Sequence, residues 1–564
     1  MIRQFSALSL IALLVLTGCT GYSPTPATVV TPPVATPVTS AQVIKHVVVI
    51  FDENISFDHY FGTYPNAANL STDAVKFTPA AGTPTNISNY VTSPELLSAN
   101  PNLNIVNAAG ATNPFRLDAS QAGTNDQDHN YGPEQTAFDG GKMDLFPFSV
   151  GTSDGLSLAT ATAAPSIANT TGLTMGYFDG NTVTAMWNYA QNYAMNDHSF
   201  GSTFGASTQG ALNLVSGQTN GVATFTAGAA SGVIADGQGG NTLVGDEDPA
   251  GDTCSSASAN VSMGGMNIGD LLNQKGITWG MFSGGFNLGI TNSNGSTGCG
   301  RETAAVHIPG NPLKADYIPH HEPFQYYAST ANPTHIRPAS VAVIGTAADT
   351  GANTANHQYD VQDFTAALAA GNLPAVSFIK APGFQDAHAG YSDPLDEQTF
   401  VVNTINAIQQ SSFWSSTAII IAYDDSDGWY DHLTDLVNGS ATSADSLNGT
   451  GVCISTGAAA SALPGPNSNG MPVQGRCGHG PRLPLLVISP WANKNFIDNT
   501  PTDQASVIRF IEDTFLSSTR IGTGSFDASA GTLNNMFNFT NNVAPNPTPV
   551  ILNPTTGAVT TSTN

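Results

Sequence analysis

Four runs of apolar, largely β-branched residues stand out in a chain that is otherwise rich in small polar residues. They cover residues 44–51, 375–379, 418–422 and 485–489. Because few polar positions interrupt them, these runs have the pattern of strands that are buried on both faces of a sheet. We therefore expect four buried strands, one near the start of the chain and three in its second half.

Helical segments alternate with these strands. Residues 361–370 precede the second strand, residues 396–410 precede the third, and residues 502–516 follow the fourth, with Thr502 as the expected cap. This alternation favours an α/β fold in which a central, mostly parallel sheet is flanked by helices. Small polar residues dominate the stretches between them, and we expect long loop insertions at residues 80–125, 220–262 and 436–475.

The first residues have the pattern of an export signal. Arg3 gives a short basic start, and the apolar run at 5–16 is too short to span a bilayer stably but fits a signal-peptide core. The run ends in LTGC, residues 16–19, which resembles a bacterial lipobox. We expect cleavage before Cys19 and a lipid on its thiol, which would anchor an exported protein to the cell envelope; an ordinary signal peptide cleaved nearby is the alternative.

Composition divides the chain into four parts. Residues 1–18 are the expected signal peptide, and residues 19–43, dense in Thr, Pro, Val and Ala, are an expected tether. Residues 44–539 contain the strand and helix patterns and form one large domain. Residues 540–564 are a low-complexity tail, in which residues 550–552 could add one edge strand.

The charge of the chain limits its partners. It has 41 acidic against 15 basic residues and a formal net charge of −26. Such a chain repels phosphate backbones, so nucleic acids are not expected as partners, and it lacks the basic face that docks on anionic lipid. A site that handles phosphate in this chain must therefore draw positive charge from a bound metal, from histidines or from helix N-termini.

The cysteines besides Cys19 lie in segments rich in Gly, Ser and Asn, and an even number of them in an exported chain suggests disulfides. Three pairings are possible. Proximity along the chain favours Cys254 with Cys299 and Cys453 with Cys477, which would limit the entropy of these loops. A metal cluster is less expected, because no two of these cysteines form a Cys-x-x-Cys pair.

Acidic residues follow the first and the third predicted strand. Asp52 and Glu53 come after the first, and Asp424, Asp425 and Asp427 come after the third. Ligands bind beyond the carboxyl ends of the strands in an open α/β sheet, where these clusters can converge. Converging carboxylates repel one another unless they are protonated or share a cation, and their oxygens suit a divalent metal. Helix capping would explain either cluster alone, but it explains both together less well.

The same segments carry a family resemblance. The sequence ENISFDHYFG, residues 53–62, resembles a signature of bacterial phospholipases C and related acid phosphatases, members of the alkaline phosphatase-like superfamily. Matching segments continue in order within residues 44–539, at His129 and at 140–144, 175–178, 200–207, 320–321, 387–390, 424–432 and 484–491. The resemblance implies an alkaline phosphatase-like fold and a divalent metal cofactor. The implied substrate is a small phosphate ester or a phospholipid.

The resemblance also implies the site residues. Carried over position by position, the metal ligands are Glu53, Asn54, Asp424, Asp425 and Ser207, and Ser207 is the nucleophile that takes the phosphoryl group. A free serine hydroxyl is a poor nucleophile, and coordination to a metal would lower its pKa and orient it. A serine that merely caps a helix is the plain alternative. A serine hydrolase is disfavoured, because no Gly-x-Ser-x-Gly sequence surrounds Ser207.

Histidines complete the implied site. The resemblance places these around the phosphate: His129, His320, His321 and His388. As imidazolium groups they could neutralise phosphate oxygens or protonate the leaving alkoxide, in a chain with few lysines and arginines. His59 and His432 lie beside bulky aromatic residues, and we expect them to support the site by packing behind it.

Two departures from the family pattern bear on the substrate. Ile55 stands where many relatives have Arg, and residues 207–211, STQGA, lack the Pro and Arg that many phospholipases carry there. Both changes weaken the expectation of a choline lipid. The segment DDSDGWYDH, residues 424–432, looks closer to the acid phosphatase branch.

The leading prediction is therefore an exported acid phosphatase with an acidic pH optimum that acts through a phosphoserine. A phospholipase C that releases a phosphorylated head group is the first alternative, because the chemistry is shared and only the leaving group differs. A surface-binding lipoprotein without activity is the second. A sulfatase is set aside, because its formylglycine precursor motif contains Pro and Arg, and residues 207–211 contain neither.

Overall fold

The structure is a computed structural model. It describes residues 37–151, 166–235, 240–308, 310–435, 465–466, 472–473, 479–522, 524–540 and 542–560. The predicted signal peptide, Cys19, most of the tether, Cys453 and Cys477 lie outside these ranges. Among the described helices, none combines the length and the apolar character needed to cross a membrane.

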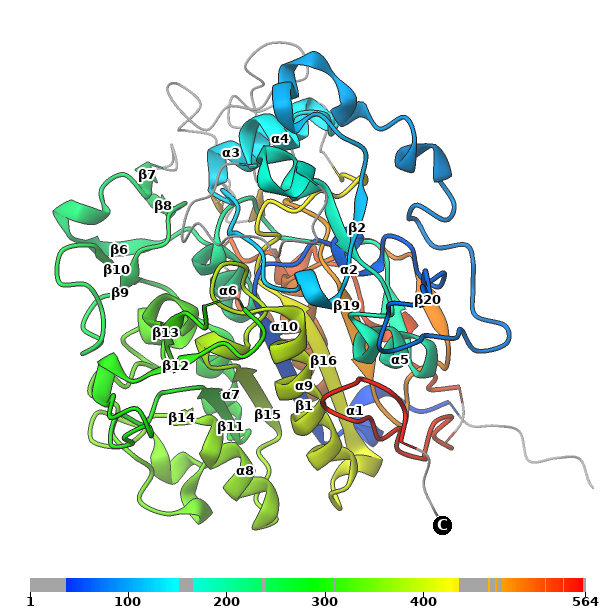
Figure 1. Ribbon diagram of the computed structural model, residues 1–564. Coiled ribbons are helices and arrows are strands. Elements are labelled where there is room, and N and C mark those ends of the chain that lie inside the picture. Colours follow the sequence, from blue (N-terminus) through cyan, green and yellow to red (C-terminus); the bar gives the residue numbers. More distant parts are fainter. Residues whose placement is uncertain are drawn as a thin grey trace, which may run out of the picture.

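An eight-stranded sheet forms the middle of the molecule, in the order β14–β11–β15–β1–β16–β19–β4–β20 (Figure 1). The strands are β14 (Gln358–Asp360), β11 (Trp279–Ser283), β15 (Val376–Lys380), β1 (His46–Asp52), β16 (Thr417–Tyr423), β19 (Leu485–Ile488), β4 (Ala194–Asn196) and β20 (Phe496–Asp498). Every neighbouring pair is parallel except the two pairs that include β19. The predicted α/β fold with a mostly parallel sheet is confirmed.

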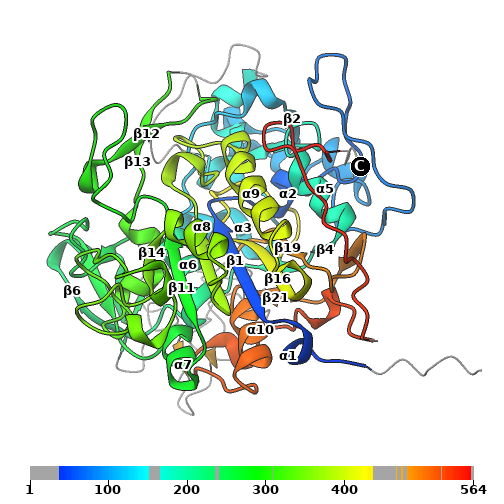
Figure 2. The ribbon, with the colours of Figure 1, turned by 90° about the horizontal axis from the view of Figure 1, so that it is seen from below.

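Helices cover both faces of this sheet. The α-helices are α1 (Ser40–Val43), α2 (Phe57–Phe61), α3 (Tyr131–Phe138), α4 (Phe146–Ser149), α5 (Thr184–Asn192), α6 (Ser207–Ser216), α7 (Ile268–Lys275), α8 (Val361–Ala369), α9 (Pro394–Gln409) and α10 (Ala505–Phe515). α6 packs against α7 and α10, and α1 packs against α10. α9 packs against α5, and Figure 2 shows α9 and α10 on opposite sides of β1.

The predicted strands correspond to β1, β15, β16 and β19, and all four are buried along nearly their whole length. The predicted helices at 361–370 and 396–410 correspond to α8 and α9. The third helix begins later than predicted, because Thr502 belongs to a short strand, β21 (Thr502–Asp503). Gln504 is the N-cap residue and makes no side-chain capping bond, whereas Oδ1 of the preceding Asp503 accepts a hydrogen bond from the backbone N–H of Ala505 at 2.8 Å.

The folded domain begins before the predicted end of the tether. The backbone N–H of Val38 donates to the carbonyl of Phe539 at 2.9 Å, and the Thr514 hydroxyl of α10 bonds the Ser40 hydroxyl at 3.0 Å. Helix α1 therefore belongs to the domain. Composition placed this short segment in the tether because it is only one helical turn long.

The segment predicted as a low-complexity tail also packs on the domain. Leu552 is 1% exposed. The Asn406 amide of α9 donates to the Leu552 carbonyl at 2.8 Å and accepts from the Leu552 N–H at 3.1 Å. Leu552 forms an isolated bridge with Val559 and does not join the central sheet as an edge strand. The Asn406 amide and the buried Leu552 side chain thus hold against the domain a segment that composition predicted as a low-complexity tail.

The predicted insertion at 220–262 contains short strands of its own. β6 (Val222–Phe225), β10 (Asn260–Met263) and β9 (Asp248–Pro249) form one small sheet, and β7 (Val233–Ala235) pairs with β8 (Asn241–Leu243). A disulfide joins Cys254 in this insertion to Cys299 in the loop after β11, with Cα atoms 5.3 Å apart. This is one of the two pairings that proximity along the chain favoured.

Candidate active site and metal centre

The two acidic clusters meet at the carboxyl edge of the sheet. Asp52 of β1 pairs with Tyr423 of the parallel strand β16, so Glu53 and Asp424 emerge side by side. Asn54 adopts a positive φ of 62°, a left-handed conformation that asparagine tolerates better than most residues. This turn brings the backbone N–H of Asn54 to 3.2 Å from Asp424 Oδ1.

Ser207 is the first residue of α6 and is 1% exposed. Its Oγ lies 2.7 Å from Glu53 Oε2, 3.0 Å from Asp425 Oδ2 and 3.4 Å from Asn54 Oδ1. The hydroxyl therefore lies where the two acidic clusters converge. The first backbone N–H groups of a helix have no partner within it, so the start of α6 adds positive potential beside this hydroxyl.

Helix α6 reaches this position because Gly210 has no side chain. A Cβ at Gly210 would lie 1.9 Å from the carbonyl oxygen of Asp424. The helix thus crosses directly over the backbone of one acidic cluster, one turn after Ser207. The small residue at 210 sets how closely the hydroxyl can approach the carboxylates.

The oxygens of Glu53, Asn54, Asp424, Asp425 and Ser207 fit a divalent cation. All five residues are buried, and neither Glu53 Oε1 nor Asp424 Oδ2 has a hydrogen-bond partner of good geometry among the described residues. Burial and the nearby Glu53 raise the pKa of Asp424 well above its usual value, and burial raises the pKa of Asp425 to about 7. Buried carboxylates crowded in this way need protons or a shared cation, and hard oxygen donors suit a hard divalent ion.

Lys380 also belongs to this site, although no sequence motif identified it. It ends β15, is 2% exposed, forms an ion pair with Glu53 Oε1 and lies 3.7 Å from Asp424 Oδ2. Burial raises the pKa of Glu53, but the positive charge of Lys380 opposes this effect, and the pKa stays well below its usual value. A signal for Lys380 was its place directly after the second predicted strand, at the same edge of the sheet.

Two of the predicted histidines contact this cluster. His321 Nδ1 lies 3.1 Å from Glu53 Oε1, and His129 Nδ1 lies 3.6 Å from Asp427 Oδ1. Asp427 in turn accepts a hydrogen bond from the Asn54 amide at 2.9 Å. Asp427 therefore links His129 to a predicted metal ligand, a role that the sequence analysis did not assign.

The other two histidines lie beside the first two. His388 stacks on Tyr391, and its ring centre is 5.8 Å from that of His129. His320 lies edge-on to His321, 3.4 Å from Asp246 and 3.4 Å from Asp248. Asp246 also accepts hydrogen bonds from the backbone and hydroxyl of Thr208, the residue after Ser207. His320 is thus tied to the nucleophile helix through an aspartate.

The four histidines differ in the charge that they favour. Burial lowers the pKa of His129, but Asp425 and Asp427 outweigh burial and raise it well above the usual value. Acidic neighbours likewise raise the pKa of His320. Burial holds the pKa of His321 well below its usual value and lowers that of His388 to about 4. His129 and His320 therefore favour the imidazolium form that the sequence predicted for all four histidines, whereas His321 and His388 favour the neutral form.

Glu134 of α3 connects two loops of the site and was not predicted. Its carboxyl group accepts a hydrogen bond from the backbone N–H of Gly205 at 2.9 Å and another from the Ser426 hydroxyl at 2.8 Å. Burial raises the pKa of Glu134 to about 8. This side chain fixes the segment before Ser207 against the segment after Asp425.

His59 and His432 lie behind the site, as expected from their aromatic neighbours. His59 stacks on Trp429 with ring centres 3.9 Å apart, and burial lowers its pKa to about 3. His432 Nδ1 bonds Asp58 Oδ2 at 2.5 Å. Below them, fully buried Arg482 forms ion pairs with Asp58 at 2.9 Å and with Asp431 at 3.0 Å. Arg482 thus joins Asp58 in the segment at 53–62 to Asp431 in the segment at 424–432.

Comparison with known proteins gives consistent results. The model of the Phosphoesterase family matches residues 44–516. Phospholipase C A of Mycobacterium tuberculosis is 23% identical over 92% of this chain and 81% of its own length. Non-hemolytic phospholipases C of Pseudomonas aeruginosa and Burkholderia pseudomallei are 31% and 33% identical over 30% and 26% of this chain. These two matches span only 24% and 19% of the length of the relatives.

Proposed function

The chain belongs to the phosphoesterase family, and on that premise we propose that it is a metal-dependent phosphoric ester hydrolase with Ser207 as its nucleophile. The observation that carries this proposal is the contact of the Ser207 hydroxyl with Glu53 at 2.7 Å and with Asp425 at 3.0 Å. The arrangement of a mostly parallel sheet with this site at its carboxyl edge also supports the alkaline phosphatase-like superfamily.

Glu53, Asn54, Asp424, Asp425 and Ser207 would hold a divalent cation. When bound, such an ion lowers the pKa of the serine hydroxyl and neutralises negative charge on the phosphate. The buried Lys380 offsets one of the carboxylate charges of the set. The start of α6 presents backbone N–H groups to a phosphate beside Ser207.

The reaction then follows from the groups around the hydroxyl. Ser207 Oγ passes its proton to a contacting carboxylate and forms a bond to phosphorus, while the bond to the alcohol breaks. His129, which favours its protonated form, donates a proton to the departing alkoxide. Water then attacks the phosphoserine, and His388, which favours its neutral form, accepts the proton of that water. The bond between phosphorus and Ser207 Oγ breaks, and the carboxylate returns its proton to Oγ as phosphate leaves.

A phosphomonoester is the proposed substrate class, and a phospholipid is the alternative. The absence of Arg at Ile55 and of Pro and Arg within residues 207–211 supports the first. The names of the relatives support the second, because each of those three relatives is a phospholipase C. The hydrolytic steps are the same, so the two differ only in the alcohol that leaves.

The test compares the purified protein with Ser207→Ala on p-nitrophenyl phosphate and on p-nitrophenylphosphorylcholine, with metal analysis of both proteins. We expect hydrolysis of the first substrate that Ser207→Ala abolishes. Preference for the choline ester would support the phospholipase alternative. Unchanged phosphatase activity in the variant would contradict the role of Ser207, and inactivity of the metal-loaded wild type on both esters would leave the surface-binding lipoprotein.

Export and the site of the reaction in the cell are part of the same proposal. The apolar run and the LTGC sequence support a lipid on Cys19 and a location in the cell envelope. Mass spectrometry of the mature N-terminus decides this point: a mature chain that begins elsewhere than at Cys19 would exclude the anchor.

A further inference from the structure

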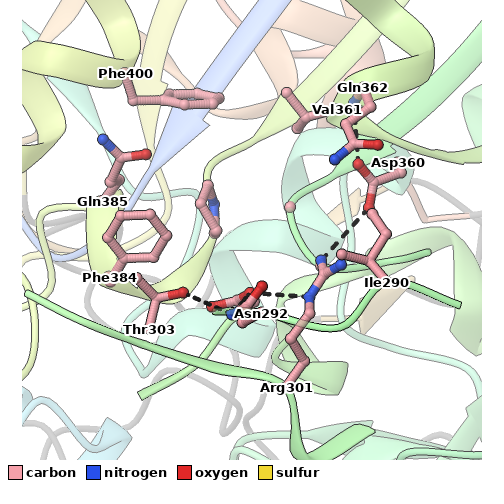
Figure 3. A pocket seen from close by; sticks show the side chains of 14 residues that line it. Ile290, Asn292, Arg301, Thr303, Asp360, Val361, Gln362, Phe384, Gln385 and Phe400 are labelled. Carbon is pink, nitrogen blue, oxygen red and sulfur yellow. Dashed lines mark hydrogen bonds and ion pairs between the residues drawn. The ribbon is translucent and has the colours of Figure 1, made fainter. Parts of the chain in front are cut away.

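A cavity of about 320 Å³ lies beyond the carboxyl ends of β11, β14 and β15, outside the proposed metal site (Figure 3). Its lining includes Gly284 after β11, Asp360 at the end of β14 and Pro382 after β15. Its size is at the lower end of the range of small-ligand sites, which is roughly 300–1,000 Å³. We call this cavity the Arg301 pocket.

One side of the Arg301 pocket is apolar. Figure 3 shows the rings of Phe384 and Phe400 on the same side, with Gln385 between them. Phe400 comes from α9, and Phe384 comes from the short 3-10 helix at Gly383–Gln385. Aromatic rings in this position can pack against the C–H face of a ligand.

The opposite side carries a buried guanidinium with hydrogen-bond donors to spare. Arg301 is 6% exposed, and its Nε lies 2.9 Å from Asp316 Oδ2. One terminal nitrogen donates to the Asn287 carbonyl at 3.3 Å, and the other lies 3.8 Å from Asp360, which is too long for a hydrogen bond. Arginine has five N–H donors, so this side chain retains donors that no described residue satisfies.

Acceptors lie beside these donors. Asp316 and Asp360 flank Arg301, and the Asn292 amide donates to Asp316 at 3.0 Å and to Thr303 at 3.0 Å. Alternating donors and acceptors on one wall match vicinal hydroxyl groups, each of which both donates and accepts.

The charge of the pocket excludes two other ligand classes. Arg301 is balanced by Asp316 and Asp360, so the wall carries a net negative charge and repels phosphate or carboxylate groups. The polar wall disfavours an acyl chain, whose burial there would leave the remaining N–H donors of Arg301 without partners. A ring with an apolar face and several hydroxyl groups satisfies both walls.

We propose that the Arg301 pocket binds a neutral carbohydrate, with its C–H face against Phe384 and Phe400 and its hydroxyl groups on Arg301, Asp316 and Asn292. This role does not depend on the proposed hydrolase activity, because the pocket contains none of the proposed metal ligands or histidines. The protein would then hold a sugar ligand beside a separate phosphoesterase centre.

Isothermal titration of the full chain with a panel of neutral mono- and disaccharides tests the proposal, with choline and inorganic phosphate as contrasting ligands. We expect at least one sugar to bind, and Phe384→Ala to weaken that binding about tenfold. Phe225→Ala is the matched control, because Phe225 is an exposed phenylalanine of β6 that does not line the pocket. Far-UV circular dichroism and thermal melting curves of both variants should match those of the wild type, which confirms that they are folded.

Three results would overturn the proposal. The first is that no sugar of the panel binds at millimolar concentration. The second is a preference for choline or phosphate over every sugar. The third is unchanged sugar binding in Phe384→Ala. If that variant fails to fold, Phe400→Leu takes its place, since it removes the other ring against which the sugar would pack while keeping an apolar side chain, and unchanged sugar binding there has the same meaning.

Discussion

The contact between α6 and the backbone of Asp424 gives a quantitative test of how the nucleophile is positioned. A Cβ added at Gly210 would lie 1.9 Å from the Asp424 carbonyl oxygen, 2.4 Å from the carbonyl carbon and 2.6 Å from the Cα. All three atoms belong to the backbone, so no side chain can rotate away. Ordinary contact begins at 3.4 Å. The helix in Gly210→Ala must therefore move away from Asp424 by about 1.5 Å, the difference between 3.4 and 1.9 Å.

Ser207 is carried by the same helix one turn earlier, so it moves with Gly210. Its distances of 2.7 Å to Glu53 and 3.0 Å to Asp425 then lengthen. A displacement of about 1 Å at a reacting group costs roughly 10²-fold in rate. We expect kcat of Gly210→Ala for p-nitrophenyl phosphate to fall by at least about that factor, with a loss of stability of about 1–3 kcal/mol from overpacking.

The assay measures kcat, KM and metal content of Gly210→Ala beside Gly300→Ala. Gly300 is a matched control, because a Cβ there would meet no atom within 4 Å. We expect Gly300→Ala to behave as the wild type. If Gly210→Ala is folded and loaded with metal yet keeps its kcat within twofold, the packing of α6 on Asp424 does not position the nucleophile, and the reasoning is refuted.

Two other predictions follow from buried charge. Lys380→Met removes the cation that pairs with Glu53, and we expect it to destabilise the metal-free protein by about 3–5 kcal/mol. We also expect a larger rise in Tm when a divalent metal is added to the variant than when it is added to the wild type. Equal metal-induced shifts of Tm in the two proteins would contradict this prediction. Burial lowers the pKa of His59 to about 3 in the folded protein, against an ordinary value of 6.5. Between these two pH values the unfolded chain binds more protons than the folded protein, so the free energy of unfolding falls as the pH falls. Urea denaturation between pH 7 and 4 should show this fall, and His59→Gln should reduce its slope by up to about 1.4 kcal/mol per pH unit; an unchanged slope would exclude His59 as a contributor.

The strands that the sequence predicted are those in which the buried positions form a nearly continuous run of apolar residues. β11, with the sequence WGMFS, is equally buried but contains glycine and serine, and Gly280 is needed where the ring of Tyr359 approaches. The direction of β19 was beyond prediction, because an apolar run does not encode whether its strand runs with or against its neighbour.

The candidate site was predictable where residues sit in recognisable segments. Glu53, Asp425 and Ser207 converge as the motif order implied. Lys380 and Glu134 belong to no such segment, and they reach the site only because β15 lies beside β1 and α3 lies over the nucleophile loop. The charge states of the histidines also depend on three-dimensional neighbours: Asp425 and Asp427 decide that of His129.

The ion pairs of Arg482 have a consequence for the order in which the molecule assembles. One guanidinium joins a segment from the beginning of the chain to two segments from its last third, and the serine helix lies between them in sequence. A nascent chain, delivered from its N-terminus, therefore cannot close this junction until almost the whole polypeptide has emerged. The proposed metal ligands extend from Glu53 to Asp425, so the centre can take up a cation only after Asp425 has emerged, in whichever compartment the chain first becomes free to fold.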